Sequence, residues 1–182
     1  MYRKHLKGRM PMKLCIYASA SDRIDKKYMV AVENLGEKLA KEGHSLIYGG
    51  GGCGLMGAAA RGFRKGNGDV IGVVPKFMHE FEPIFDNCTQ VIETEDMADR
   101  KEIMENGCDA FIIVPGGIGT FDEFFQALTL RELKQHNKHI TIYNIDGYFD
   151  KLLDYMNDCI EKGFIKAIVR DFFTVINVSS NS

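Results

Sequence analysis

The sequence lacks long hydrophobic runs, an excess of charge of either sign, and closely paired cysteines. Its longest apolar stretches hold five to seven residues, whereas a helix that spans a bilayer needs about 20. The 23 Lys and Arg nearly balance the 25 Asp and Glu, for a formal net charge of −2 and a pI of about 6.2. We therefore expect no membrane segment and no nucleic-acid partner.

The cysteine pattern excludes a disulfide framework. The five cysteines are odd in number, widely spaced and free of any C-x-x-C pair. Reduced thiols in a cytoplasmic protein fit this pattern best. We expect a cytoplasmic location and no bound metal.

The length of 182 residues, with 45% hydrophobic residues, suits one compact domain. Residues 1–13 carry five Lys and Arg, no acid, and none of the apolar core of a signal peptide. We expect residues 1–12 to form a flexible leader, with a phosphate-binding arm as the alternative. Residues 13–182 are expected to form a single Rossmann-like domain.

Short apolar runs alternate with segments of helical period along most of the chain. Because these runs do not alternate apolar and polar residues, both faces of the sheet should be covered, as in parallel sheets. The pattern predicts a doubly wound parallel α/β sheet flanked by helices. The expected strands are Lys13–Ala18, Ser45–Tyr48, Asp69–Val74, Gln90–Glu93, Ala110–Val114, Ile140–Asn144 and Phe172–Val178, and the expected helices are Lys26–Lys41, Leu55–Lys65, Met97–Asn106, Phe121–Gln135 and Phe149–Glu161.

Glycine is abundant: 19 residues are about six more than an average composition supplies. The first cluster runs from Gly49 to Gly57 between an expected strand and an expected helix. Its final glycines form G-x-G-x-x-G, in which bare backbone can approach a phosphate at a helix N-terminus. A dinucleotide site would also need an acid closing the next strand, where Pro75-Lys76 stands instead. NAD binding is therefore disfavoured.

A second glycine loop, Pro115–Thr120, also follows a buried strand and precedes a helix. Two such loops at the carboxyl ends of parallel strands define a crevice lined with N–H groups, which suits a small phosphorylated ligand. Glu123 follows Thr120 by three residues, so spacing alone favours a capping box in which each side chain bonds the other residue's amide.

Other charged residues fall near the same edge of the sheet. Arg100-Lys101 opens an expected helix, where cations oppose the helix dipole and so suggest an anionic partner; the alternative is a pair of solvated side chains. Asp22 and Asp25 precede the first helix and are expected to cap it. The irregular segment 76–89 is long enough for a flap over the site, or for a plain connector.

Five segments together resemble the LOG (Lonely Guy) family, over about Met12 to Phe164. The most specific part is the ordered pair M-x-x-R-K and P-G-G-x-G-T-x-x-E. The segments are Gly49-Gly50-Gly51 through Gly54-Leu55-Met56-Gly57, Val73-Val74-Pro75, Met97-Ala98-Asp99-Arg100-Lys101, Pro115 to Glu123, and Asn144 to Tyr148.

The resemblance implies an enzyme that hydrolyses the N-glycosidic bond of a purine nucleoside 5′-monophosphate, either AMP or a cytokinin riboside 5′-monophosphate. It also implies a homodimer or a larger homo-oligomer and no cofactor. By position in the motifs, Arg100 and Glu123 take the catalytic places. The substrate-binding residues that it implies are Glu82, Lys101, Gly116, Gly117, Ile118, Gly119, Thr120, Thr129, Gly50, Gly51 and Met56.

The chain departs from the family pattern at three places. The first strand of the family commonly ends Cys-Gly-Ser-Ser, where this chain has Tyr17-Ala18-Ser19-Ala20-Ser21. Thr-Trp is replaced by Thr129-Leu130, and Lys-Pro by Lys138-His139. The first change puts the contact made by that loop in doubt. The other two concern the wall of the site and base preference rather than Arg100 and Glu123.

The hydrolysis that the resemblance implies gives Glu123, Thr120 and Arg100 separate roles. N-glycoside hydrolysis passes through an oxocarbenium-like sugar, which a carboxylate stabilises more than it stabilises the substrate. Glu123 would act there as base, nucleophile or electrostatic stabiliser, while Thr120 and glycine-loop amides fix the 5′-phosphate. Arg100 would orient the nucleotide and assist departure of the base, because a guanidinium is a poor proton donor at neutral pH.

Two other functions remain as alternatives. A nucleotide or pterin-cofactor carrier of the same fold would bind its ligand without cleaving it. Lysine decarboxylase, an older label for relatives of the family, would need a lysine placed to hold pyridoxal phosphate. Lys76 and Lys101 are better explained by attraction to phosphate, so the sequence does not support that activity.

Overall fold

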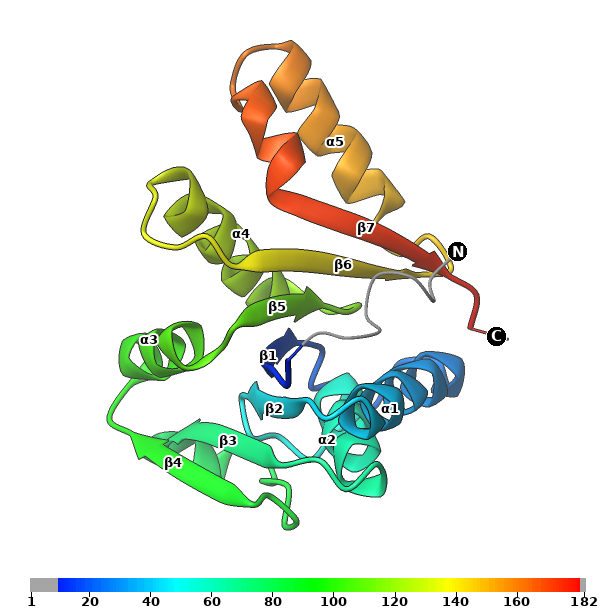
Figure 1. The fold of residues 1–182 in the computed structure, drawn as a ribbon, viewed down its shortest axis with the longest axis vertical. Coiled ribbons are helices and arrows are strands. Elements are labelled where there is room, and N and C mark those ends of the chain that lie inside the picture. The colour runs from blue at the N-terminus through cyan, green and yellow to red at the C-terminus, as the bar shows by residue number, and fades with distance from the viewer. Residues whose placement is uncertain (1–9, 181–182) are drawn as a thin grey trace.

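The computed structural model describes residues 10–180, and its centre is a seven-stranded sheet (Figure 1). The strand order is β4-β3-β2-β1-β5-β6-β7, and neighbouring strands are all parallel. The order reverses at β1, which confirms the predicted doubly wound α/β fold. The strands are β1 (Lys13–Tyr17), β2 (Ser45–Tyr48), β3 (Val70–Pro75), β4 (Gln90–Thr94), β5 (Ala110–Ile113), β6 (His139–Ile145) and β7 (Phe173–Val178).

Helices cover both faces of this sheet (Figure 1). One core layer packs α1 and α2 against the sheet, and the other packs α3, α4 and α5 against the opposite face. The helices are α1 (Lys26–Lys41), α2 (Gly54–Lys65), α3 (Met97–Gly107), α4 (Ile118–Glu132) and α5 (Asp150–Glu161), with 3-10 segments η2 (Lys76–Glu80) and η3 (Ala167–Phe172). None of the helices in residues 10–180 has the length and apolarity needed to cross a bilayer.

The two-sided cover explains why the strands lack an alternating pattern. In β1, Leu14 and Ile16 belong to the layer under α1 and α2, while Cys15 and Tyr17 belong to the layer under α3 and α4. All four are buried, as expected for a central strand of a parallel sheet.

Residues 1–9 of the expected leader lie outside the described part of the chain. The Met12 carbonyl already accepts a hydrogen bond from the Ser45 amide at 2.9 Å, and the Met12 amide donates to His44 Nδ1 at 3.0 Å. Met12, the residue before β1, is therefore already hydrogen-bonded to the start of β2 and to the residue that precedes it.

Candidate functional site

The site lies at the carboxyl ends of the strands around β1, where the winding of the sheet reverses. Open α/β sheets bind their ligands at such a reversal. Here β1 leads into the loop before α1, β2 into the first glycine loop, and β5 into the second glycine loop. The first turn of α3 and the second turn of α4 bring Arg100 and Glu123 to the same edge.

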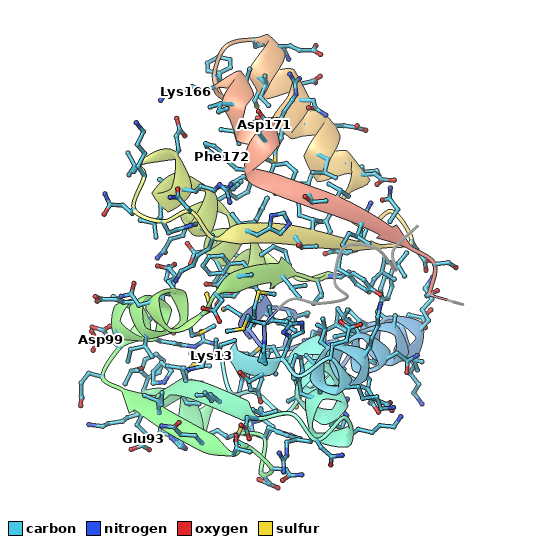
Figure 2. The ribbon with its side chains drawn as sticks, viewed as in Figure 1. Lys13, Glu93, Asp99, Lys166, Asp171 and Phe172 are labelled. Carbon is cyan, nitrogen blue, oxygen red and sulfur yellow. The ribbon has the colours of Figure 1, made fainter. Side chains whose placement is uncertain are left out.

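Arg100 is a buried cation. Helix α3 begins after Asp96, whose side chain accepts hydrogen bonds from the first-turn amides. Asp99 projects outward from this turn (Figure 2), whereas Arg100 is only 8% exposed. Its Nε donates to the Val73 carbonyl at 3.2 Å. The alternative of a solvated first-turn arginine is therefore wrong, because the side chain turns inward over β3.

The first glycine loop makes room for this guanidinium. A Cβ at Gly49 would lie 1.7 Å from Arg100 Nη2 and 2.7 Å from Met56 Cε. A Cβ at Gly51 would lie 3.2 Å from Met56 Cε and 3.3 Å from Glu82 Oε2. The structure thus places Met56 beside both glycines, with Arg100 next to Gly49 and Glu82 next to Gly51.

Gly50 has a different surrounding from its neighbours. Its φ is +81°, and a Cβ there would lie 2.3 Å from the Val74 side chain on β3. A left-handed backbone pressed against a strand requires glycine. Gly50 therefore allows the first glycine loop to turn tightly against β3.

The start of α2 is closed by the chain itself. The amides of Leu55 and Met56 donate to the Ser19 carbonyl at 2.8 and 3.1 Å, and the Gly54 amide donates to Asp22 Oδ1 at 2.8 Å. These are the groups that a helix N-terminus would otherwise offer to an anion. The prediction that the G-x-G-x-x-G loop presents its helix amides to a phosphate is therefore wrong.

The same contacts revise one of the two predicted caps. Asp25 does cap α1, by accepting from the Lys27 amide at 3.0 Å. Asp22 instead caps α2, 32 residues further along the chain. The departure from Cys-Gly-Ser-Ser therefore lies in a loop that also supplies the Ser19 carbonyl to α2.

The second glycine loop is open by contrast. Gly117, Ile118 and Gly119 are exposed, and a Cβ at either glycine would meet nothing within 4 Å. Gly117 is the N-cap of α4 and makes no side-chain capping bond. Within residues 10–180 no acceptor is bonded to the amides of Ile118 and Gly119, so this helix N-terminus is available to an anion.

The first part of the second loop, at Gly116, is held by contacts with the protein, while the amides that follow it face solvent. A Cβ at Gly116 would lie 2.0 Å from Thr120 Oγ1, so Thr120, at 3% exposure, packs directly over Gly116. The Tyr148 hydroxyl donates to the Gly116 carbonyl at 2.7 Å. Both contacts hold the loop from the protein side.

Glu123 is not part of a capping box. Helix α4 begins at Ile118, three residues before the predicted Phe121, so Thr120 lies inside the first turn instead of at the N-cap. The Glu123 carboxylate turns toward Arg100, with Oε1 3.9 Å from Nη1, and its side chain is 12% exposed. Burial raises the pKa of Glu123 to about 7, although Arg100 opposes the rise.

Lys101, on α3, packs against α4, which carries Thr129. Lys101 Nζ is 2.7 Å from Asp122 Oδ2 and 2.8 Å from Gln126 Oε1. Thr129 donates to the Phe125 carbonyl at 2.8 Å and is exposed. At about 1.5 Å per residue, Thr129 lies about 9 Å further along the helix than Glu123. The structure places Lys101 near the Arg100–Glu123 pair and Thr129 on the outer part of α4.

The segment 76–89 is held at both ends, and Glu82 lies between the two anchors. His79 Nε2 lies 3.1 Å from Glu93 Oε1 of β4, and Figure 2 shows Glu93 on this edge strand. At the other end, the Gly52 amide donates to the Pro83 carbonyl at 2.8 Å, and the Phe85 amide donates to Gly50 at 2.9 Å. This second anchor fixes Glu82 above the first glycine loop.

Two buried polar residues near Glu123 were missed from the sequence. Tyr17 ends β1 and Glu105 lies on α3; both are at most 8% exposed. Each has a buried side-chain oxygen without a hydrogen-bond partner in the described residues. Tyr17 falls within an apolar run and Glu105 within a charged helical segment, so neither position stands out in the sequence.

Comparisons with known proteins agree with the motifs. A family model described as "Possible lysine decarboxylase" matches residues 56–181. The chain is similar to the "Probable cytokinin riboside 5′-monophosphate phosphoribohydrolase LOGL5" of Oryza sativa subsp. japonica, with 34% identity over 93% of this chain and 69% of the relative. It is also similar to the cytokinin riboside 5′-monophosphate phosphoribohydrolase LOG3 of Arabidopsis thaliana, with 34% identity over 87% of this chain and 74% of the relative.

Solved structures share the fold. The molybdenum cofactor carrier protein of Chlamydomonas reinhardtii superposes with a TM-score of 0.68 at 22% identity, over 92% of this chain and 89% of that one. The molybdenum cofactor binding protein of Rippkaea orientalis gives 0.65 at 22% identity, over 96% and 93%. At these identities the likeness concerns the fold alone.

Proposed function

This chain belongs to the LOG family of cytokinin riboside 5′-monophosphate phosphoribohydrolases, and we propose that it hydrolyses a purine nucleoside 5′-monophosphate to the free base and ribose 5-phosphate. The substrate is AMP or a cytokinin riboside 5′-monophosphate. One observation carries the proposal: the buried Arg100–Glu123 pair lies behind an open helix N-terminus at the reversal of the sheet.

The 5′-phosphate binds at the second glycine loop. The amides at the start of α4 point to the exposed side of Gly117 and Gly119, and the helix dipole favours an anion there. Holding the phosphate fixes the ribose relative to Glu123 without taking part in the reaction, which lowers the entropic cost of reaching the transition state.

Glu123 acts at the anomeric carbon. The C–N bond to the base breaks, its electron pair leaves with the base, which takes up a proton from solvent, and water supplies the hydroxyl that ends on the sugar. Glu123 either takes the proton of that water or attacks first to form an ester that water then opens; both routes use the ionised carboxylate. The developing positive charge of the sugar favours that ionised form in a buried site.

Arg100 positions the substrate and balances the charge of the site. Its Nε is committed to the Val73 carbonyl and Nη1 faces Glu123, so the guanidinium has a fixed orientation. A guanidinium stays charged at neutral pH, which favours electrostatic stabilisation of the departing base over proton donation. Met56, next to Gly49 and the guanidinium, and Glu82, next to Gly51, complete the wall on the side of the first glycine loop.

A lysine decarboxylase activity has little support from the lysines near the site. That chemistry needs a lysine that forms a Schiff base with pyridoxal phosphate. Lys101 is paired with Asp122 and Gln126, and Lys76 is exposed and paired with Glu95. Neither is the desolvated, unpaired lysine that a Schiff base requires.

We also propose a homodimer in the cytoplasm. Ile118 is 84% exposed, Leu133 62% and Phe125 38%, so α4 presents large apolar side chains that a second copy would cover. The five cysteines are free thiols, which fits a reducing compartment. Light scattering of the purified protein is expected to give twice the mass of the 20.5 kDa chain; a monomer at micromolar concentration would contradict the dimer.

The activity is tested by incubating purified protein with AMP and with isopentenyladenosine 5′-monophosphate and measuring free base by chromatography. We expect stoichiometric base and ribose 5-phosphate from at least one of them. Tight binding of a nucleotide without release of base would favour the carrier alternative, which the fold likeness to molybdenum cofactor carriers keeps relevant. If the protein neither binds a nucleotide nor releases base, both the hydrolase and the carrier functions are contradicted.

A further inference from the structure

Met97 places an oxidisable sulfur against the guanidinium of Arg100. It is the first residue of α3, and its thioether accepts a hydrogen bond from Arg100 Nη1, with Sδ 3.8 Å from the nitrogen. The same Nη1 lies 3.9 Å from Glu123 Oε1. One nitrogen of the buried cation therefore faces both the Met97 sulfur and the carboxylate that acts on the sugar in the proposed mechanism.

Met97 is exposed, unlike most methionines of the chain. Among residues 10–180 only Met10 and Met97 are exposed, at 82% and 37%. The other methionines in that range are half-buried or buried. Solvent reaches the Met97 side chain although its partner Arg100 is only 8% exposed. A dissolved oxidant can therefore reach a sulfur that is in direct contact with the Arg100 guanidinium.

Oxidation of this sulfur changes what Met97 offers to Arg100. Hydrogen peroxide transfers one oxygen atom to a thioether: the O–O bond breaks, an S–O bond forms, the sulfur is oxidised by two electrons, and peroxide is reduced to water. The product, methionine sulfoxide, is polar, and its oxygen is a much better hydrogen-bond acceptor than the weakly accepting thioether sulfur. Because the sulfur is already 3.8 Å from Nη1, that oxygen can come within about 3 Å of it, a normal hydrogen-bond length.

A sulfoxide bonded to Nη1 competes with Glu123 for the same nitrogen. The ion pair with Glu123 is already long, at 3.9 Å, so a shorter bond to the sulfoxide is favoured over it. Arg100 Nε is bonded to the Val73 carbonyl at 3.2 Å. The guanidinium can therefore turn about Nε toward Met97 without leaving its place over β3.

We propose that Met97 is a modification site that controls the enzyme: oxidation to the sulfoxide by a peroxide draws Arg100 Nη1 away from Glu123 and lowers base release, and reduction of the sulfoxide restores it. The inference rests on the proposed function, in which Arg100 orients the nucleotide and balances the charge of the site. Met97 itself takes no part in the reaction.

The test treats wild type, Met97→Leu and Met10→Leu with hydrogen peroxide and then with dithiothreitol. Dithiothreitol reverses sulfenic acids and disulfides at the five free cysteines and leaves methionine sulfoxide in place. Base release from the nucleotide that wild type cleaves best should fall by about 10-fold or more in oxidised wild type and oxidised Met10→Leu, because the guanidinium is displaced. Oxidised Met97→Leu should keep the rate of its untreated form.

Repair and dose separate Met97 from other oxidised residues. Methionine sulfoxide reductases A and B together should restore the activity of oxidised wild type. In partly oxidised wild type, the lost activity should follow the sulfoxide fraction at Met97, measured by peptide mass spectrometry, and not the fraction at Met10. This correlation tests the inference even if Met97→Leu folds poorly. An equal loss in oxidised Met97→Leu, or a Met97 that stays unoxidised while Met10 is modified, would overturn the inference.

A second readout does not depend on activity. Nitrogen-15 NMR follows the Arg100 Nε–H, which donates to the Val73 carbonyl. Its signal should shift when wild type is oxidised and should not shift when Met97→Leu is oxidised. An unchanged signal in oxidised wild type would contradict a bond between the sulfoxide and Arg100. If untreated wild type releases no base, the proposed function fails, and this signal still decides whether Met97 acts on Arg100.

Discussion

The two glycine loops occupy equivalent places in the fold and do different things. Each follows a buried strand and leads into a helix at the carboxyl edge of the sheet. In the first, the helix amides of Gly54 and its successors are bonded by Ser19 and Asp22. In the second, Gly117 and Gly119 face open space. The first loop therefore packs against protein side chains, and the second is the proposed anion site.

This difference shows why glycine is needed in each loop. At Gly49 the missing Cβ makes room for Arg100 and Met56. At Gly119 it leaves space outside the protein, where a phosphate can approach the backbone. The same residue type thus serves internal packing in one loop and ligand access in the other. Substitutions in the two loops should separate catalysis from binding.

Among the substitutions that compare the two loops, the largest effect is expected for Gly49→Ala. The new Cβ would displace the Arg100 guanidinium, whose flexible end can move at little cost to the fold. A displacement of about 1 Å in a catalytic group costs about 100-fold in rate, so kcat should fall by at least about that factor. Steady-state kinetics and calorimetric titration with ribose 5-phosphate check this, and we expect the affinity to stay close to wild type. A matching loss of affinity would mean that the first loop also binds the phosphate.

The next effect concerns the burial of Glu123 behind the second loop. Its pKa is raised in the folded protein to about 7, from an ordinary value of 4.5, so the folded state holds the proton more tightly than the unfolded state. Stability from this group is present below pH 4.5 and is lost as pH rises toward 7. Glu123→Gln should therefore be more stable than wild type by about 3 kcal/mol at pH 8.

The measurement is the free energy of unfolding of both proteins in urea at pH 4.5 and pH 8. The gain in Glu123→Gln should shrink toward zero at the lower pH. Asp122→Asn, one residue away and exposed, serves as the control and should show a smaller difference between the two values of pH. A gain for Glu123→Gln that is equal at both would show that the carboxylate is not strained by burial.

A smaller effect is expected for Gly119→Asp in the open loop. A carboxylate in the first turn of a helix is compatible with the helix dipole, so the fold should keep its stability. It would repel a phosphate and compete for the same amides, which should weaken binding of ribose 5-phosphate by about 10-fold. Gly119→Ala is the steric control and should weaken binding less. Wild-type affinity in Gly119→Asp would place the phosphate elsewhere.

The smallest effect is expected for Asp22→Ala, in the loop between β1 and α1 that closes the start of α2. Loss of the hydrogen bond from the Gly54 amide leaves that amide without its partner, so the free energy of unfolding should fall. Because the α2 amides hold no ligand in this account, the affinity for ribose 5-phosphate should not change. Urea denaturation and titration of the same preparation check both statements, and a gain or loss of affinity would reopen the role of α2.

The fold could be predicted from the sequence because both faces of the strands are covered. Continuous apolar runs such as those of β1 and β5 are typical of that situation, and the expected boundaries lie within a few residues of those observed. The start of α4 was placed too late because Thr120 and Glu123 imitate a capping box. Spacing along the chain does not show that Glu123 faces Arg100 across the site.

The state of the first glycine loop could not be predicted from its motif. G-x-G-x-x-G describes a backbone that a phosphate can approach, but it does not show whether another segment already bonds the amides. Here that segment is the loop of Ser19 and Asp22, more than 30 residues earlier in the chain. The burial of Tyr17 and Glu105 is likewise a product of tertiary packing.

The central claim is that Glu123, behind an open phosphate site, cleaves the glycosidic bond. The most direct measurement is release of free base by Glu123→Gln, assayed with the nucleotide that wild type cleaves best, alongside titration of the same variant with ribose 5-phosphate. We expect base release to fall by about three orders of magnitude or more while the affinity for ribose 5-phosphate stays within a few-fold of wild type. Base release near the wild-type rate would contradict the account.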